Sequence, residues 1–236
     1  MSLHGDPIIY GIKPHKSEAV PSHALGALGV DNAGRRFRYA RAGELLVAGN
    51  VLQSKVENTA DQALAFAAAA VGALQVTTTS TVTVTANEYA NGFLVVTVTP
   101  DLGRTYRIKS HPAATAGTLV ITLFEPLVTA WTTATRADLV ANPYDSVIQN
   151  PVTTPTSNAV GVACFAIPSG EYGWIQTGGI AAVLSDGVTA VGRSVVSAPV
   201  AAGAVIDEAS TTQQIIGVAA AGIASNENGA IYLTID

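Results

Sequence analysis

The segment from Gly170 to Gly192, which reads GEYGWIQTGGIAAVLSDGVTAVG, constrains the fold of this chain most strongly. Apolar residues alternate there with small or polar ones, and Gly178–Gly179 and Asp186–Gly187 interrupt the alternation. Alternation bounded by glycine-rich turns is typical of short, half-buried β-strands joined in hairpins. The segment holds no nucleophile beside a base, no carboxylate pair and no phosphate-binding loop. It therefore predicts β-structure without visible chemistry.

Strand and turn signals recur along the rest of the chain. After position 158, short apolar runs follow one another at intervals of about 8–12 residues, as expected of a β-barrel or β-sandwich. Asn91–Gly92 separates the run VTTTSTVTVTA from FLVVTVTP, which predicts a hairpin. A second pair is predicted between Arg104–His111 and Thr118–Leu127. A turn is expected at Asp31–Gly34, before a short strand that begins at Arg36.

Two segments depart from this pattern. Residues 58–74, NTADQALAFAAAAVGAL, form the one plausible helix, because Asn58 or Thr59 can cap it and alanine is the best helix former. Residues 129–157 contain three prolines among asparagines and threonines, so an irregular connector is expected there.

The predicted fold is mainly β, with short-stranded β-sandwich or β-barrel units, an extended N-terminal arm and at most one or two short helices. Residues 1–41 are predicted to form the basic arm, and residues 42–157 a β-rich domain that includes the connector at 129–157. Residues 158–236 are predicted to form a C-terminal domain resembling a β-barrel or β-sandwich.

The prediction of an arm depends on proline and on charge. Pro7, Pro14 and Pro21 favour extended chain over helix. Residues 1–41 carry six basic residues against three acidic ones, whereas residues 111–236 carry two arginines against nine acids. A basic leader on an acidic body predicts that the two ends face different neighbours. A solvated surface with uneven charge is the alternative.

The composition favours contact with other subunits over contact with water. Only 12% of the residues are charged and 48% are hydrophobic, although a large β core would fit the same numbers. The longest apolar run, around Ala63–Leu74, is shorter than the ~18 residues of a membrane span. The start has no basic segment followed by an apolar one, so synthesis in the cytoplasm and no membrane partner are expected.

No residue pattern supports an enzyme. The sequence lacks the short motifs of serine hydrolases, zinc proteases, phosphate loops and dinucleotide folds. The spacing of His4, His15, His23 and His111 matches no zinc pattern. The adjacent acids Asp207–Glu208 would point to opposite faces of a strand, which makes a calcium site a weak hypothesis. We therefore predict no catalysis, no cofactor and no metal.

Three further features have ordinary interpretations. Cys164 lies in an apolar run and is expected to be a buried, inert thiol, and one cysteine forms no internal disulfide. Glu171 beside Tyr172 and Trp174 would suit a sugar site, but aromatic side chains near glycine turns more often fill the end of a β-barrel. The cluster at 35–39, RRFRY, would suit nucleic acid, yet an acidic chain with so few arginines predicts no nucleic-acid partner.

Three stretches resemble small β-rich structural proteins of tailed-bacteriophage heads. The first, LGALGVDNAGRRFRYARAGE, is similar to an LG…DGR-x-F-R-Y-x-x-AG run near the N-terminus of such proteins, although Asn32–Gly34 departs from their simpler Asp-Gly turn. The second, ANEYANGFLVVTVTPDLGRTYRIKSH…AGTLVITLFEPL, is similar to their Y-x-x-G…G-x-x-Y-x-I hairpin region. The third begins at YGW-x-Q-x-x-G and continues through a DG turn to VG-x-x-V. The order of the stretches is preserved, and together they cover more than half of the chain.

The resemblance implies a capsid decoration (cement) protein or a closely related minor virion structural protein. Such proteins bind the outer surface of an expanded shell, often as trimers at threefold positions, and clamp major capsid protein subunits against the pressure of the DNA. The implied partners are the major capsid protein and sister copies in a homotrimer, and the implied location is the virion. A proline-rich arm would lie along a sheet edge of a capsid subunit, and the charge-poor body would pack on sister copies.

The basic residues of the arm are the predicted contacts with the capsid. They are Lys13, Lys16, Arg35, Arg36, Arg38 and Arg41. The alternative function is a receptor- or glycan-binding virion module, such as a head fibre or tail-tip protein, which would use the loops of residues 129–157. A virion-associated hydrolase is a third hypothesis without support from any residue.

Overall fold

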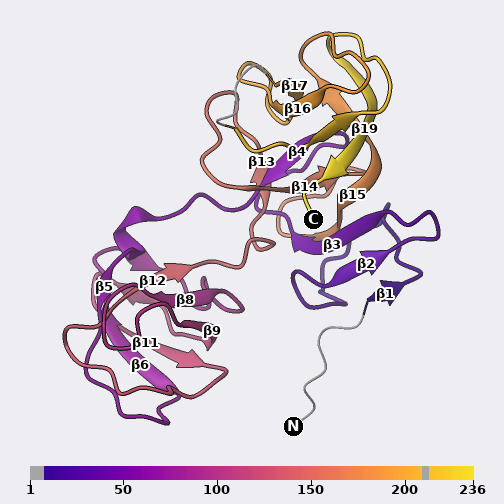
Figure 1. Ribbon diagram of the computed structural model, residues 1–236. Helices are drawn as coiled ribbons and strands as arrows, with labels where there is room; N and C mark the ends of the chain where they lie inside the picture. Colours follow the sequence, from indigo (N-terminus) through magenta and orange to yellow (C-terminus); the bar gives the residue numbers. More distant parts are fainter. Residues whose placement is uncertain (1–7, 209–212) are drawn as a thin grey trace. The chain divides into compact units, whose positions relative to one another are not determined.

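The chain folds into two compact β-units. The computed structural model describes residues 8–208 and 213–236. One unit, here called the split unit, combines Met1–Val56 with Pro143–Asp236, and the other, the inserted unit, is Glu57–Asn142. Within the described residues the only helical element is a single 3₁₀ turn, η1 (Thr59–Asp61), which confirms the prediction of a mainly β fold with barrel-like units (Figure 1).

The inserted unit is built around a six-stranded antiparallel sheet that closes on itself. The strands run in the order β5-β12-β8-β9-β11-β6. An antiparallel bridge between Phe66 and Thr78, with a 2.9 Å hydrogen bond from the amide of Ala67 to the carbonyl of Thr77, joins the last strand to the first. The six are β5 (Leu64–Ala65), β6 (Gln75–Thr79), β8 (Phe93–Val96), β9 (Thr105–Ser110), β11 (Thr118–Leu123) and β12 (Arg136–Val140), beside a small pair of β7 (Thr83–Val84) and β10 (Ala114–Thr115).

The core of the inserted unit follows from strict alternation along its strands. In β9, Tyr106 and Ile108 are buried. The alternate residues Thr105, Arg107 and Lys109 are exposed, as a strand with one face on the core requires. Trp131 lies in the same core and packs edge-on against Phe66 and Tyr106. Asp101 satisfies two polar groups of this core, because its Oδ2 accepts from the Tyr106 hydroxyl at 2.6 Å and from the Trp131 indole N–H at 3.1 Å.

The split unit contains an eleven-stranded sheet with one long strand at its centre. Most of the strands follow the order β1-β2-β3-β15-β17-β16-β18-β19, with β14, β4 and β13 attached beside β15. They are β1 (Ile9–Tyr10), β2 (Leu28–Val30), β3 (Arg36–Arg41), β4 (Val51–Gln53), β13 (Ile148–Gln149), β14 (Ala159–Ala163), β15 (Tyr172–Ser185), β16 (Ser194–Ser197), β17 (Val205–Asp207), β18 (Gly217–Ala219) and β19 (Glu227–Thr234).

Gly178–Gly179 bends a strand where the sequence predicted a turn between two strands. β15 runs through both glycines, and its pairing with β3 shifts register between Gln176 and Gly178. From Gly178 onward the strand pairs instead with β19. Gly179 has φ +81°, and a Cβ there would lie 3.3 Å from the Cα of Arg35, so glycine permits both the bend and the close approach. One strand therefore serves two parts of the sheet.

The predicted helix at residues 58–74 is wrong beyond its first turn. Asn58 does cap η1, since its side chain accepts from the amide of Ala60. The alanine-rich remainder is not helical. Phe66 is buried, its amide donates to the carbonyl of Thr135 just before β12, and it forms a bridge with Thr78 of β6. The segment has too little amphipathic character for a helix to compete with that pairing.

The two predicted hairpins had different outcomes. The pairing of 104–111 with 118–127 is confirmed, since β9 and β11 are antiparallel neighbours. The hairpin across Asn91–Gly92 is wrong, because β8 pairs with β9 and β12, while β6 pairs with β11. Asn91 does adopt a left-handed conformation at φ +61°. The strand that follows it, β8, nevertheless pairs with β9 and β12, which come later in the chain.

The predicted segment boundaries also differ from the structure. Residues 8–41 form β1, β2 and β3 within the sheet, so this part of the predicted arm is folded; residues 1–7 of the arm lie outside the described residues. The units divide at 56/57 and 142/143 instead of at 41/42 and 157/158. The predicted connector at 129–157 contains β12 and β13. Residues far apart in sequence complete one sheet, which local patterns do not reveal.

We predict that Asp101→Asn destabilises the inserted unit by about 2 kcal/mol at neutral pH, because hydrogen bonds to a charged acceptor are stronger than neutral ones. Burial opposes ionisation of Asp101, but the hydrogen bonds from Tyr106 and Trp131 outweigh it and lower its pKa. A lowered folded-state pKa stabilises the fold above the ordinary pKa near 4 and loses that effect as the pH falls through the folded value.

The measurement is urea unfolding at several pH values, followed by the indole N–H resonance of Trp131. The stability gap between wild type and variant should narrow as the pH falls below about 4. A gap that does not change with pH would show that the charge of Asp101 plays no part.

Candidate functional site: a contact face and an aromatic pocket

Four of the six predicted contact residues are held by partners within the split unit. The Arg35 guanidinium pairs with Asp31 at 2.7 Å, Arg38 binds both carboxylate oxygens of Asp236 at 2.6 and 3.0 Å, Arg41 pairs with Asp145 at 2.5 Å, and Arg36 donates to the main-chain carbonyl of Asp236 at 3.0 Å. The two-point contact of Arg38 with Asp236 is bidentate, and such pairs are among the stronger polar contacts in proteins. These arginines therefore tie β3 to distant segments of its own unit.

The turn at Asp31–Gly34 is confirmed, and Asp31 organises it. Its carboxylate accepts from the amides of Ala33 and Arg35, each at 2.9 Å, and from the Arg35 side chain. Burial opposes ionisation of Asp31, but these hydrogen bonds outweigh it and lower its pKa. The Arg35 side chain also lies over the Phe37 ring at 5.5 Å. The basic cluster of the sequence is therefore largely part of the hairpin's own structure.

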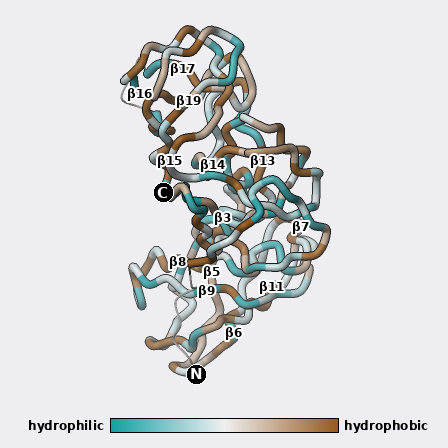
Figure 2. Tube along the Cα trace, turned by 90° about the vertical axis from the view of Figure 1, so that its right-hand side faces the viewer, coloured by the Kyte–Doolittle hydropathy of each residue, from teal (hydrophilic) through white to brown (hydrophobic). Residues whose placement is uncertain are grey.

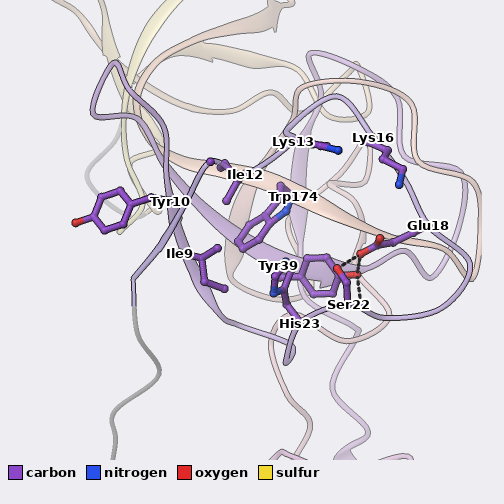
Figure 3. Close-up of a pocket in the computed structure, with 11 residues that line it drawn as sticks. Ile9, Tyr10, Ile12, Lys13, Lys16, Glu18, Ser22, His23, Tyr39 and Trp174 are labelled. Carbon is purple, nitrogen blue, oxygen red and sulfur yellow. Dashed lines mark hydrogen bonds between the residues drawn. The ribbon is translucent and has the colours of Figure 1, made fainter.

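Lys13 and Lys16 are placed differently from the arginines. Both are exposed, and neither ammonium group has a hydrogen-bond or ion-pair partner among the described residues. They line a pocket of about 290 Å³ in the split unit, together with Glu18, His23 and Trp174 (Figure 3). The other lining residues are Ile9, Tyr10, Gly11, Ile12, Ser22 and Tyr39.

The floor of this pocket is aromatic. Trp174 on β15 and Tyr39 on β3 pack with ring centroids 5.2 Å apart, and His23 lies 5.2 Å from the first and 5.3 Å from the second. A Cβ on Gly29 would approach the Trp174 ring to 2.7 Å, so glycine at that position makes room for the indole. The aromatic side chains thus have a structural role, as the sequence predicted, and also border an open space.

One wall of the pocket carries a fixed carboxylate. Glu18 Oε1 accepts from both the Ser22 and the Tyr39 hydroxyls, and these two hydrogen bonds lower the pKa of Glu18 (Figure 3). Burial, followed by the hydrogen bond to Glu18, raises the pKa of Tyr39 to about 12. The Tyr39 hydroxyl therefore remains a donor at neutral pH. The other carboxylate oxygen of Glu18 has no partner among the described residues.

A second notable surface lies on the outward face of β15, β19 and β18. Ile180, Tyr232 and Val218 are direct cross-strand neighbours in the register of these strands, and all three are exposed. The residues beside them along the strands, such as Ala181 and Ile231, point into the core. The only charged residue of these three strands is Glu227, at the start of β19. We call this surface the apolar face.

The apolar face was not predicted from the sequence, although a signal for it was present. The run IAAVL in β15 is apolar at every position, whereas a strand with one solvated face alternates. Figure 2 shows hydrophobic and hydrophilic residues interspersed along much of the trace. On the outward side of this run, Ile180 and Ala182 are exposed, although Ala182 also lines a small pocket beside Ala48 and Arg35 of the same unit.

The remaining candidates for chemistry are accounted for by structure. Burial raises the pKa of Cys164 to about 11 and keeps the thiol protonated, although the residue is half-buried and not fully buried as predicted. His111 is buried and accepts from the amide of Tyr89. Asp207 pairs with Arg193 at 3.4 Å. His4 lies outside the described residues.

The described residues contain no group of three or more His, Cys, Asp and Glu side chains arranged to hold a metal ion. They also contain no helix with the length and apolarity to cross a membrane.

Comparison with known proteins identifies no relative. No protein-family model, no curated protein and no solved structure matches the chain.

We predict that Arg38→Ala destabilises the split unit by about 1 kcal/mol, because it removes a two-point contact with Asp236 and a 2.9 Å hydrogen bond to the carbonyl of Gly26. Arg193→Ala is the matched control, since Arg193 is 60% exposed and its single ion pair is longer. The measurement is the free energy of unfolding in urea. Equal effects of the two variants would contradict the structural role of Arg38.

Proposed function

We propose that this chain is a non-enzymatic virion structural protein that decorates and cements the outer surface of a tailed-phage capsid. In this proposal its partners are the major capsid protein and sister copies in a homotrimer. The protein would act by adding contacts that bridge neighbouring capsid subunits.

The apolar face carries this proposal. Large apolar side chains exposed side by side on three strands of one sheet are typical of an interface between proteins. Tyr232 lies at its centre, between Ile180 and Val218. Aromatic residues surrounded by smaller apolar ones contribute much of the binding energy at such interfaces. We assign this face to packing against a protein subunit of the shell or its decoration.

The segments that resemble phage head proteins give separate support. The first of them forms β2 and β3, and the third begins with β15. These strands are adjacent and antiparallel, with Trp174 opposite Tyr39 and Gln176 opposite Phe37. Two stretches separated by more than a hundred residues thus form one continuous structure. A chance likeness in two unrelated stretches would not require them to pair.

The structure changes which residues we expect to contact the shell. Arg35, Arg36, Arg38 and Arg41 satisfy internal partners, so their charges are poorly placed to attract a neighbour. The contact is therefore expected to depend on apolar burial more than on charge. Repetition of a modest contact over many copies on a shell then gives strong retention. Binding of this kind is expected to be insensitive to moderate salt.

We predict that Tyr232→Glu weakens binding to capsids at least tenfold, because it places a charge at the centre of the apolar face. The measurement is co-sedimentation with expanded shells assembled from the major capsid protein of the same virus and lacking decoration. The wild-type protein should bind saturably, with three copies at each threefold position.

Leu102→Glu is the matched control, since Leu102 is 61% exposed but belongs to the inserted unit and is not one of the residues of the apolar face. It should bind shells as the wild type does. If the wild-type protein does not bind shells, the proposed function is wrong. If Tyr232→Glu binds normally while the wild type binds, the function stands and the assignment of the face fails.

A further inference from the structure

We propose that the aromatic pocket of the split unit binds an acidic sugar, such as a uronic or sialic acid residue of a surface glycan. This activity is separate from capsid binding and uses a different surface. The pocket brings together a donor with no partner, two cationic side chains and one carboxylate that still has a free oxygen. Each of these groups selects part of the ligand.

The indole N–H of Trp174 is the first of these groups. The Trp174 side chain is 4% exposed, yet its N–H donates to no acceptor among the described residues. The other tryptophan of the chain, Trp131, uses its N–H to bind Asp101. The Trp174 N–H is not among the buried polar atoms that lack a partner, so it is accessible to solvent. Trp174 lines the pocket, so its N–H is available to donate to a ligand there.

Lys13 and Lys16 select for a negative charge on that ligand. Both line the same pocket, and neither is neutralised by an ion pair within the described residues. A carboxylate bound between two ammonium groups and an indole N–H would make charge-assisted hydrogen bonds, which are stronger than neutral ones. The nearest acid, Glu18, is already partly satisfied by Ser22 and Tyr39.

Glu18 distinguishes a sugar from a simple carboxylate. Its free oxygen is an acceptor, so it requires a donor on the ligand and repels a second negative charge. Sugar hydroxyls supply such donors, whereas the side chain of an acidic peptide does not. Figure 3 draws Lys16 and Glu18 on neighbouring parts of the pocket wall, and the Lys16 charge acts on Glu18 to lower its pKa, after the larger effects of Ser22 and Tyr39. One ligand with both hydroxyls and a carboxylate satisfies both side chains.

The size and the apolar lining of the pocket fit a single ring. A volume of about 290 Å³ lies near the lower limit for small-molecule sites. Ile9 and Ile12 line it beside Trp174, and these side chains offer apolar contact to the C–H groups of a sugar ring. The remaining groups are the hydroxyl of Ser22 and the imidazole of His23, which can bond to further hydroxyls. The pocket thus suits one acidic monosaccharide unit better than a long chain.

The two tryptophans allow a direct test in the intact protein. In ¹⁵N-labelled full-length chain, the indole resonances of Trp174 and Trp131 are followed while N-acetylneuraminic acid or glucuronic acid is added. We expect the Trp174 resonance to shift and saturate while that of Trp131 stays unchanged. Glucose, acetate and a short glutamate-containing peptide are the comparison ligands and should bind at least tenfold more weakly.

Surface variants keep the test informative if changes at Trp174 disturb folding. Lys13→Ala with Lys16→Ala should weaken binding of the acidic sugars about tenfold or more, and Lys109→Ala, on β9 of the inserted unit, should leave it unchanged. Glu18→Gln should reduce the preference for acidic sugars over acetate.

The outcomes separate this proposal from the capsid function. No shift at Trp174, or equal shifts with glucose, would overturn it, and tighter binding of the peptide would reassign the pocket to a protein ligand. Tyr232→Glu should still bind the sugar, since Tyr232 does not line the pocket. Loss of shell binding in that variant with sugar binding retained would show that the two sites act independently.

Discussion

The split unit depends on one strand that pairs along both of its edges. The first half of β15 lies between β3 and β14, and the second half pairs with β19 and, at Ser185, with β17. The bend at Gly178–Gly179 makes this change of partners possible. Because β15 joins the N-terminal hairpin to the C-terminal strands, both the aromatic pocket and the apolar face are built on it. Trp174 comes from its first half and Ile180 from its second.

The basic residues of β3 make contacts within their own unit. Arg38 binds the last residue, Asp236, and Arg41 binds Asp145, so basic residues of β3 fix segments that arrive from distant parts of the sequence. Two surfaces of the split unit remain available to partners. One is the apolar face, and the other is the aromatic pocket, which is lined by Lys13 and Lys16. These surfaces suit a protein neighbour and a small anionic ligand, respectively.

The sequence predicted some elements well and others poorly, for identifiable reasons. The turn at Asp31–Gly34 and the β9–β11 pair were predicted because their signals are local: an Asx turn, and two alternating runs joined by a short loop. The alanine-rich segment after Asp61 was assigned to helix because propensity favours it, but burial of Phe66 between neighbouring strands outweighed propensity. The six basic residues were identified from charge alone, and charge does not reveal which acids lie beside them.

The sequence by itself determined the class of the fold and the places where the chain turns. Alternation, glycine and asparagine act over a few residues, so their effects can be read without a structure. Only the tertiary structure decided that residues 57–142 are inserted into another unit, that β8 pairs with β12, and that Trp174 lines one pocket with Lys13 and Lys16. Backbone hydrogen bonds join any two strands alike, so pairing between distant strands is chosen by how their side chains pack together.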